Sequence, residues 1–398
     1  MSGLQIGPIA VGTPVVLAPM AGVTNAPFRR LCREAGAAGL PVERFAEFAD
    51  SPAPAGLYVA EMVTSRALLE RNEKSMQIIS HDAGESVRSI QLYGVDPVTV
   101  RGAVRMLIEE DRADHVDLNF GCPVPKVTRK GGGAVLAWKT DLFGAIVSAA
   151  TEEARGTDVP VTIKMRMGID ADHLTYLDAA RRARDAGVAS IALHARTAAD
   201  YYSGTADWDA IATLKQEITD VPVLGNGDIW SAEDAMAMVA YTGCDGVVVG
   251  RGCQGRPWLF TDLVAAFAGS DVRVRPGLRE VAEVMRRHAR LMVEHFDGQE
   301  LKAMRELRKH MSWYLKGYAV GGEARRQLGL VSTLAELDER LEDLDLTQPY
   351  PGEGAEGPRG RAGTPKKPHV PEGWLDSRTL DESWRKMLLE AESSVSGG

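Results

Sequence analysis

The stretch VDLNFGCPVPKVTRKGGG, residues 116–133, joins a strand-like run to a loop of unusual composition. Apolar residues alternate along its first part and the run stops at Gly121, which predicts a buried β-strand with Cys122 at its C-terminal tip. The loop after Cys122 carries two prolines, three cations and three glycines, so we expect a stiff, positively charged loop with exposed backbone. A buried structural thiol is the commoner role for a lone cysteine, but the flanking Gly121 and Pro123 favour a functional one.

This strand is one of eight apolar or β-branched runs that recur along the chain at strand length. Most are separated by amphipathic stretches of good helix formers, such as residues 96–110, 174–187 and 231–243. Eight strand–helix units predict an α/β fold of the (β/α)8 TIM-barrel type. A doubly wound sheet also alternates strands and helices, but the count of eight and the polar strand ends favour the barrel. The runs are VVLAPM (15–20), LYVAEM (57–62), SIQLYG (89–94), HVDLNFG (115–121), VTIKMR (161–166), SIALHAR (190–196), VPVLGNG (221–227) and DGVVVGR (245–251).

The pattern along the chain changes after the eighth run. We expect the barrel over residues 1–268, with an insertion at about 38–56 whose Pro/Ala/Gly end suggests a surface loop. Residues 269–348 show only helical periodicity and predict a helical bundle domain. Residues 349–373 are rich in Pro and Gly without apolar periodicity, which predicts a disordered linker, and residues 374–398 predict a tail with one short helix.

Cysteine usage and hydropathy point to a cytoplasmic protein. The four cysteines, at positions 32, 122, 244 and 253, have neither CxxC spacing nor a histidine at metal-ligand spacing. We therefore expect no disulfide framework and no metal site. The N-terminus lacks a basic, apolar leader, and no window of about 18 uninterrupted apolar residues occurs, so we expect no membrane segment.

The charge is distributed unevenly over the 398 residues, whose formal net charge is −9. Residues 286–326 hold ten Lys/Arg against five Asp/Glu, whereas residues 336–345 hold six acids and one Arg. A basic module inside an acidic protein is compatible with binding to nucleic acid, because contacts to phosphates supply much of the affinity in such complexes.

The residues around Cys122 resemble the signature of the tRNA-dihydrouridine synthases, and in particular of the bacterial B-type members. The resemblance covers roughly residues 10–345, and the insertion at 38–56 departs from the family pattern. It implies an FMN-binding barrel, a helical tRNA-binding domain, NADPH (or NADH) as reductant and a monomer. It also implies that FMN N5 gives a hydride to C6 of a uracil and that Cys122 gives a proton to C5, forming 5,6-dihydrouridine. The motif is carried by Asn119, Gly121, Cys122, Pro123, Lys126, Arg129 and Lys130, of which we expect Asn119, Lys126, Arg129 and Lys130 at the tRNA.

The resemblance also implies a flavin site at the C-terminal ends of the strands, where barrels carry their chemistry. Lys164 stands on an apolar strand where an unpaired ammonium is costly, so an anionic flavin edge or a carboxylate must lie near it. Gln91 can both donate and accept at a flavin edge, or be a surface residue. His194 is implied at the flavin, or is a histidine of the barrel core, and the nearby Arg196 is expected at the tRNA. Strand one contributes the flavin-binding turn Pro19, Met20 and Ala21.

The loops after strands seven and eight form the strongest signal after Cys122. Their glycines expose backbone N–H groups at the place where barrels bind phosphate, and Arg251 adds positive charge beside a short helix. We expect Asp228 to fix the turn or to contact the ribityl hydroxyls. No GxGxxG or P-loop run occurs, which argues against a Rossmann nucleotide site. The expected residues are Asn226, Gly227, Asp228, Gly250 and Arg251.

The helix predicted near residues 300–319 carries its cations on one face and its apolar residues on another. Such a face is usually only solvated. The adjoining Trp313 and the local positive charge favour contact with RNA phosphates. The residues concerned are Lys302, Arg305, Lys309 and Lys316.

We therefore expect an oxidoreductase acting on CH–CH bonds (EC 1.3.1.-), a tRNA-dihydrouridine synthase. One alternative is an FMN enzyme for a free pyrimidine, like dihydroorotate dehydrogenase, which has no need of a basic helical domain. The other is a flavin-bearing RNA-binding protein without turnover, against which the intact Cys122 argues.

Overall fold

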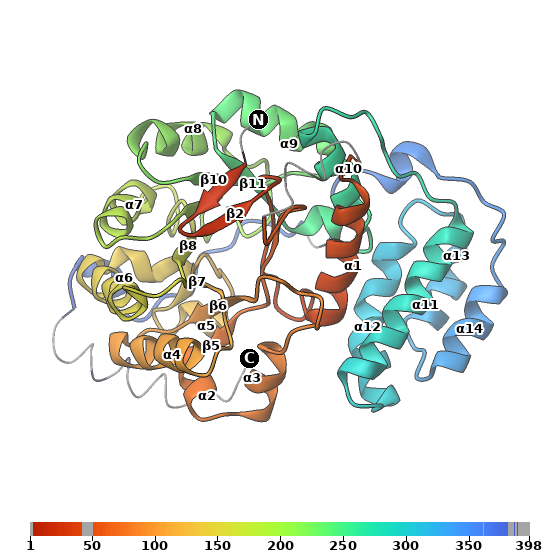
Figure 1. Cartoon of the computed structure of the whole chain (residues 1–398), viewed down its shortest axis with the longest axis horizontal. Coiled ribbons are helices and arrows are strands. Elements are labelled where there is room, and N and C mark those ends of the chain that lie inside the picture. Colours follow the sequence, from red (N-terminus) through yellow and green to blue (C-terminus); the bar gives the residue numbers. More distant parts are fainter. Residues whose placement is uncertain (1–2, 42–50, 361, 381–385, 387, 389–398) are drawn as a thin grey trace.

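The computed structural model describes residues 3–41, 51–360, 362–380, 386 and 388. Within them, nine strands form one sheet, and all neighbouring strands are parallel. Figure 1 shows this sheet ringed by helices, with a second group of helices at its side. The strand order is β4 (Leu57–Tyr58), β3 (Val15–Leu17), β11 (Gly246–Val249), β10 (Val223–Asn226), β9 (Ile191–His194), β8 (Val161–Arg166), β7 (His115–Phe120), β6 (Ser89–Tyr93) and β5 (Val63–Thr64).

The sheet closes through the extended stretch at residues 57–64, which contains both β4 and β5. The first end pairs with β3 and the other end with β6. Between them Val59 forms a parallel bridge with Ser89, and the Ala60 N–H donates to the Ser89 carbonyl at 2.9 Å. A doubly wound sheet has two free edges, whereas this stretch joins both. The (β/α)8 barrel is therefore confirmed, with the eight predicted runs as its strands.

Two of the helices around the barrel begin or end at residues that local chemistry favours. The helix after β6 starts with Asp96, whose carboxylate accepts from Thr99 N–H, and has Pro97 in its first turn. The helix after β10 has a capping box between Ser231 and Asp234 and ends at Gly243 in the left-handed region. The helices are α1 (Ala26–Ala38), α2 (Ser65–Leu69), α3 (Glu73–Ile78), α4 (Pro97–Glu109), α6 (Thr140–Ala154), α7 (Tyr176–Asp185), α8 (Trp208–Glu217), α9 (Ala232–Thr242) and α10 (Leu259–Phe267).

An antiparallel hairpin, β1 (Leu4–Ile6) and β2 (Ile9–Val11), closes the N-terminal end of the barrel. Its apolar side chains join the buried residues of the barrel interior. The end of the insertion packs against it, because Ser51 Oγ donates to the Ala10 carbonyl at 2.7 Å and Gly12 N–H donates to the Ala53 carbonyl at 3.0 Å. Pro52 is exposed, as expected of a surface loop, but Ala53 and Ala55 are buried, so that expectation is wrong for these two residues. Residues 42–50 of the insertion lie outside the described residues.

Four α-helices after the barrel enclose an apolar core of their own: α11 (Leu278–His295), α12 (Glu300–Tyr314), α13 (Gly321–Leu328) and α14 (Leu334–Glu342). This group packs against the barrel through α1 and α11. At the contact the Phe28 ring lies 5.7 Å from the ring of His288 and 5.4 Å from that of His310. Within the described ranges, no helix is long and apolar enough to cross a lipid bilayer.

The segment that follows the helices differs from the predicted disordered linker. It contains two short 3-10 turns, η4 (Gly352–Ala355) and η5 (Trp374–Asp376). Arg359 is buried and donates to the carbonyls of Gln254 and Trp313, and the Lys366 N–H donates to the Ala199 carbonyl at 2.9 Å. Single anchoring side chains thus hold a Pro/Gly-rich segment against the barrel. Most of the predicted tail helix, at residues 381–385, 387 and 389–398, lies outside the described residues.

Candidate active site

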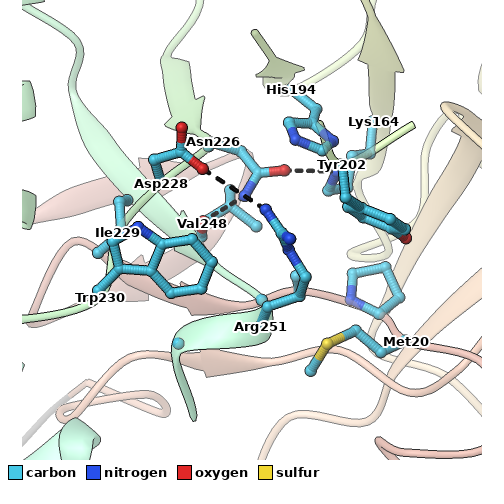
Figure 2. A pocket seen from close by; sticks show the side chains of 15 residues that line it. Met20, Lys164, His194, Tyr202, Asn226, Asp228, Ile229, Trp230, Val248 and Arg251 are labelled. Carbon is cyan, nitrogen blue, oxygen red and sulfur yellow. Dashed lines mark hydrogen bonds and ion pairs between the residues drawn. The ribbon is translucent and has the colours of Figure 1, made fainter. Parts of the chain in front are cut away.

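The strand ends bring most of the predicted cofactor residues around one pocket at the C-terminal end of the barrel (Figure 2). They come from β3, β8, β9, β10 and β11 and from the loops that follow these strands. The sequence reasoning missed Tyr202 and Trp230, which also line the pocket. The predicted residues found there are Pro19, Met20, Lys164, His194, Asn226, Gly227, Asp228, Gly250 and Arg251.

Lys164 on β8 lies in this pocket with an amide rather than a carboxylate as its partner. Its Nζ donates to Asn226 Oδ1 at 2.9 Å, and Asn226 Nδ2 donates to the Val248 carbonyl at 2.7 Å. Within the described part of the chain, Lys164 forms no ion pair. Burial lowers its pKa to about 8, with the neighbouring Arg166 acting in the same direction and Asp117 opposing both. An anionic group in the pocket would complete its environment.

The pocket has an excess of positive charge. His194 at the end of β9 is buried, and its pKa is held well below the usual value, first by burial and then by four surrounding cations. The imidazole is therefore neutral at pH 7 and offers one donor and one acceptor. Asp228 is the single carboxylate among the residues that line the pocket. The cations around His194 are Arg166, Lys164, Arg196 and Arg251.

Asp228 ties together the loops that follow β9, β10 and β11. Its carboxylate accepts from Arg196 Nη2 at 2.8 Å and from the Ala206 N–H at 2.7 Å, and Arg251 Nη2 lies 3.5 Å away. Arg196 is 2% exposed and also donates to the Ser203 carbonyl. The expectation that Arg196 contacts tRNA is therefore wrong, because its guanidinium is buried behind the pocket.

Arg251 reaches into the pocket between two aromatic rings. Its guanidinium carbon lies 4.6 Å from the centre of the Tyr202 ring and 4.9 Å from that of Trp230. Burial lowers its pKa to about 10, helped by the charge of Arg196 and opposed by Asp228. The pair of tyrosines in the DYYSG run after β9 was the sequence signal for this aromatic wall.

Two glycines allow the loops after β9, β10 and β11 to pack closely. Gly227 has a φ of +133°, and a Cβ there would lie 2.6 Å from the Ala206 Cβ. A Cβ on Gly252 would overlap the carbonyl of Ile229, and the 3-10 turn η3 (Arg251–Cys253) begins just before it. Any larger residue would push these loops apart, so the pocket wall depends on glycine at both positions.

The buried Gln91 and the half-buried Asn119 form an amide pair that holds the backbone of Cys122. Asn119 Oδ1 accepts from the N–H groups of Gly121 and Cys122, each at 3.0 Å. Asn119 Nδ2 donates to Gln91 Oε1 at 2.7 Å, and Gln91 Nε2 donates to Asp117 Oδ2 at 2.7 Å. Gln91 is 1% exposed and does not line the pocket. Both residues thus orient the cysteine loop, a role that the sequence reasoning did not give them.

The Cys122 thiol is half-buried at the start of this loop, whereas Cys32, Cys244 and Cys253 are buried. Burial raises the pKa of Cys122, although the Val124 N–H and the charge of Arg166 act in the opposite direction. The thiol therefore stays protonated at neutral pH.

The loop after Cys122 contains the short helix α5 (Pro125–Thr128) and then the three glycines. These glycines are buried, so the expected exposed backbone is wrong. A Cβ on Gly132 would lie 2.6 Å from the Tyr93 ring, and one on Gly133 would overlap the Cys122 carbonyl. The glycines permit close packing beneath the thiol rather than binding of an anion.

A second cavity, of about 570 Å³, lies between the cysteine loop and the helical group. Ala21, predicted at the flavin, lines this cavity instead of the first pocket, together with Lys126 and Lys302. The sequence reasoning missed Glu61, whose carboxylate accepts from the Gly22 N–H and whose pKa is raised by burial. The size of this second cavity suits a ligand of nucleotide dimensions.

The remaining residues predicted to bind tRNA differ in their exposure and in their contacts within the protein. Arg129 and Arg305 are exposed, and Lys130 is half-buried. Lys309 pairs with Glu306 at 2.7 Å. Lys316 is engaged elsewhere, since its Nζ donates to the carbonyl of Pro358 at 2.9 Å and to that of Glu356. The expectation that Lys316 binds tRNA is therefore wrong.

Comparison with known families agrees with this geometry. The family model described as Dihydrouridine synthase (Dus) matches residues 16–348, which is most of the chain. The chain belongs to the dihydrouridine synthase family. The family is one of oxidoreductases, and its match includes every strand of the barrel as well as the four helices α11 to α14.

Relatives of this dihydrouridine synthase are found at high identity over nearly full length. A probable tRNA-dihydrouridine synthase of Mycobacterium tuberculosis (strain ATCC 25618 / H37Rv) is 55% identical over 372 residues, 94% of this chain and 92% of the relative. One of Mycobacterium leprae (strain TN) is 54% identical, covering 90% and 95%. The tRNA-dihydrouridine synthase B of Pseudomonas aeruginosa is 36% identical over 345 residues, covering 87% and 93%.

Among solved structures, a histamine dehydrogenase from Rhizobium sp. 4-9 is 11% identical to this dihydrouridine synthase. It covers 86% of this chain and 64% of that chain, with a TM-score of 0.47. A likeness this weak supports no conclusion about the chain. The segment at residues 349–380 lies beyond the family match.

Proposed function

We propose that the protein reduces specific uridines of tRNA to 5,6-dihydrouridine, with FMN as its cofactor and NADPH as reductant. The observation that carries the proposal is a protonated, half-buried thiol, Cys122, whose loop lines the cavity of about 570 Å³ through Val124, Lys126 and Val127, together with a cationic pocket among the strand ends. Membership of the dihydrouridine synthase family and the names of the relatives support the same reaction.

The residues that line the cationic pocket suit the anionic and polar groups of a flavin mononucleotide. Lys164 lacks a carboxylate partner among the described residues, and it suits the N1/O2 side of the ring, which becomes anionic on reduction. Arg251 and the close-packed glycines after β10 and β11 suit the phosphate. Asp228, held by Arg196, fixes these loops and leaves the phosphate to the cations. The neutral His194 offers a hydrogen bond to the ring.

The Cys122 thiol is the general acid of the proposed reaction. When bound, reduced FMN supplies the hydride that adds to C6 of the uracil. Cys122 donates its thiol proton to C5, which requires the thiol to be neutral at the working pH, and burial ensures this. Asn119 fixes the backbone of Cys122 through two N–H groups, so the thiol is held in place without using its own proton.

The second cavity suits a uridine that has left its stack. Taking a base out of a tRNA loop costs a few kcal/mol, which contacts to phosphates offset. Lys126 from the cysteine loop and Lys302 from the helical group line this cavity from its two sides. Cations from both parts of the protein thus face the space where the RNA would enter.

The helical group and the Cys122 thiol favour the proposed function over the two alternatives. An enzyme for a free pyrimidine has no use for cations contributed by a second group of helices, whereas an RNA substrate does. A flavin-bearing RNA-binding protein without turnover has no use for a thiol kept protonated by burial and oriented by two amides. Both alternatives therefore explain less of the site.

Mapping dihydrouridine in tRNA from cells that lack this protein tests the proposal directly. We expect at least one position to lose the modification, and expression of the protein should restore it. Purified enzyme with NADPH and that unmodified tRNA should form dihydrouridine at the same position. An unchanged map, together with no NADPH consumption on tRNA, would contradict the proposed function.

Substitution of the exposed cations on α12 is expected to weaken tRNA binding in a salt-dependent way. The double variant Lys302→Ala/Arg305→Ala removes two charges that face solvent near the cavity, and each phosphate contact releases counterions. The slope of log K against log salt should fall by about one to two units, with NADPH oxidation in the absence of tRNA unchanged.

The measurement is tRNA binding across a salt series. The matched control is Arg279→Ala/Arg326→Ala, which removes two exposed charges from α11 and α13 outside the cavity lining. Equal slopes for the wild type and the α12 variant would mean that this face is only solvated.

A further inference from the structure

The segment at residues 349–380, here called the C-terminal strap, reaches the structure beneath Cys122. Its Arg359 donates to the Trp313 carbonyl of the helical group, and its Lys366 N–H donates to the Ala199 carbonyl in the loop after β9. Further along the strap, Trp374 packs against the barrel. Trp374 is 0% exposed and is the largest fully buried side chain among the described residues. A tryptophan buried this deeply by a segment with little other secondary structure marks the point where the strap is anchored.

Trp374 packs directly on the glycine loop that follows Cys122. The Gly131 residue has a φ of +74°, and a Cβ there would lie 2.5 Å from the Trp374 ring. The indole Nε1 donates to the Val135 carbonyl at 3.0 Å, within the 3-10 helix η2 (Gly133–Trp138). The ring therefore supports both the glycine turn and the first residues of η2.

Residues after Trp374 fasten the other end of η2. The buried ammonium of Lys139 lies 5.1 Å from the centre of the Trp374 ring and donates to the Ser377 carbonyl at 2.7 Å. The Thr140 N–H donates to the Arg378 carbonyl at 2.8 Å. The strap thus holds η2 from Gly133 to the start of α6.

The first residues of η2 contact the backbone of Cys122. The Ala134 N–H donates to the Cys122 carbonyl at 3.0 Å, and Gly133 is so close to that carbonyl that a side chain would overlap it. Asn119 fixes the N–H side of Cys122, while η2 fixes its carbonyl side. A shift of η2 would therefore move the thiol.

We propose that Trp374 is a positioning residue for Cys122, acting through η2 on the geometry of proton transfer. The inference rests on the proposed function for its kinetic consequence, whereas the placement of the thiol is a separate, measurable property. It also assigns a role to a segment that lies beyond the family match at residues 16–348.

The test compares Trp374→Ala and Trp374→Phe in the full chain with Leu214→Ala, a control on α8. Leu214 is 0% exposed and lies away from η2, so its truncation lowers stability without touching the cysteine loop. Three readouts are taken: flavin reduction by NADPH, flavin reoxidation by tRNA, and the rate at which iodoacetamide alkylates Cys122 across a pH series. Peptide mass spectrometry isolates Cys122 from the three buried cysteines.

Trp374→Ala is expected to slow reoxidation by tRNA by about 10- to 100-fold, because small misplacements of a reacting group have effects of this size. Reduction by NADPH should change less than about twofold, and alkylation of Cys122 should show a changed rate and midpoint pH. Trp374→Phe should recover most of the reoxidation rate. Leu214→Ala, at a similar loss of thermal stability, should leave all three readouts near wild type.

Two results would overturn the inference: wild-type reoxidation and alkylation in Trp374→Ala, or equal losses in Leu214→Ala. If the wild-type protein itself shows no reoxidation by tRNA, the proposed function fails. Altered alkylation in Trp374→Ala would then still support the positioning of the thiol.

Discussion

Dihydrouridine formation is expected to fall by about 10²-fold or more in Cys122→Ala, the size of a lost general acid. The thiol is the half-buried cysteine of the four, and burial keeps it protonated at neutral pH. Alanine leaves the two hydrogen bonds to Asn119 Oδ1 in place, because their donors are the backbone N–H groups of residues 121 and 122. The variant should therefore retain its flavin and its reduction by NADPH.

The measurement separates the two half-reactions by stopped-flow spectroscopy, with reduction by NADPH followed by reoxidation by tRNA. Cys244→Ala is the control, since Cys244 is buried under the barrel strands and away from the pocket. Only Cys122→Ala should slow reoxidation. Turnover on tRNA close to wild type in that variant would remove Cys122 from the mechanism.

The pH dependence of reoxidation follows from the raised thiol pKa. The proton donor is active in its neutral form, which is lost as the pH rises through the thiol pKa. Because burial moves that pKa upward, the wild-type rate should stay flat from neutral pH to beyond the range of an ordinary thiol. A rate that already declines near pH 7.5 would show that another group supplies the proton.

The barrel was predictable because each of its strands is a short apolar run ending in polar residues or glycine. The hydrogen-bond partners of the polar residues in those strands were less predictable. Asn119 lies next to the end of β7, but Gln91 is the central residue of β6, where the register pairs it with Asp117 on the neighbouring strand. The side-chain amides of Gln91 and Asn119 bond to each other. Sequence gives the position of a side chain along a strand but not which neighbour takes its hydrogen bonds.

Contacts between distant segments account for the other corrections. The role of Lys316 depends on carbonyls 40 and 42 residues later, at Glu356 and Pro358. Arg359 and Trp374 stand as isolated large residues in a Pro/Gly-rich stretch, where composition predicts disorder. Two well-placed anchors are enough to order such a segment, and no periodicity reveals them.

Loss of the Lys164 ammonium is expected to raise the dissociation constant for reduced FMN, whose N1/O2 edge is anionic, by about 10²-fold, since removing one member of a buried charged pair costs roughly 3 kcal/mol. In the free protein the Lys164 amine has only the Asn226 amide as its hydrogen-bond acceptor among the described residues. Lys164→Met keeps the apolar stem and removes the charge. The variant should purify with less flavin and, when saturated with FMN, should be reduced more slowly by NADPH.

The pH dependence of FMN binding distinguishes a cation for the flavin from a structural lysine. The free ammonium has a pKa of about 8, and the anionic edge of reduced FMN beside it favours the charged form, so the pKa is higher in that complex. The affinity for reduced FMN should therefore be constant from neutral pH to about pH 8 and fall by up to tenfold per pH unit above it, until the pKa of the complex is reached. Lys164→Met should lack this fall. The control Lys215→Met, which breaks an ion pair with Asp245 on the surface of α8, should keep it. Equal pH profiles for wild type and Lys164→Met would show that the ammonium faces no anionic part of the cofactor.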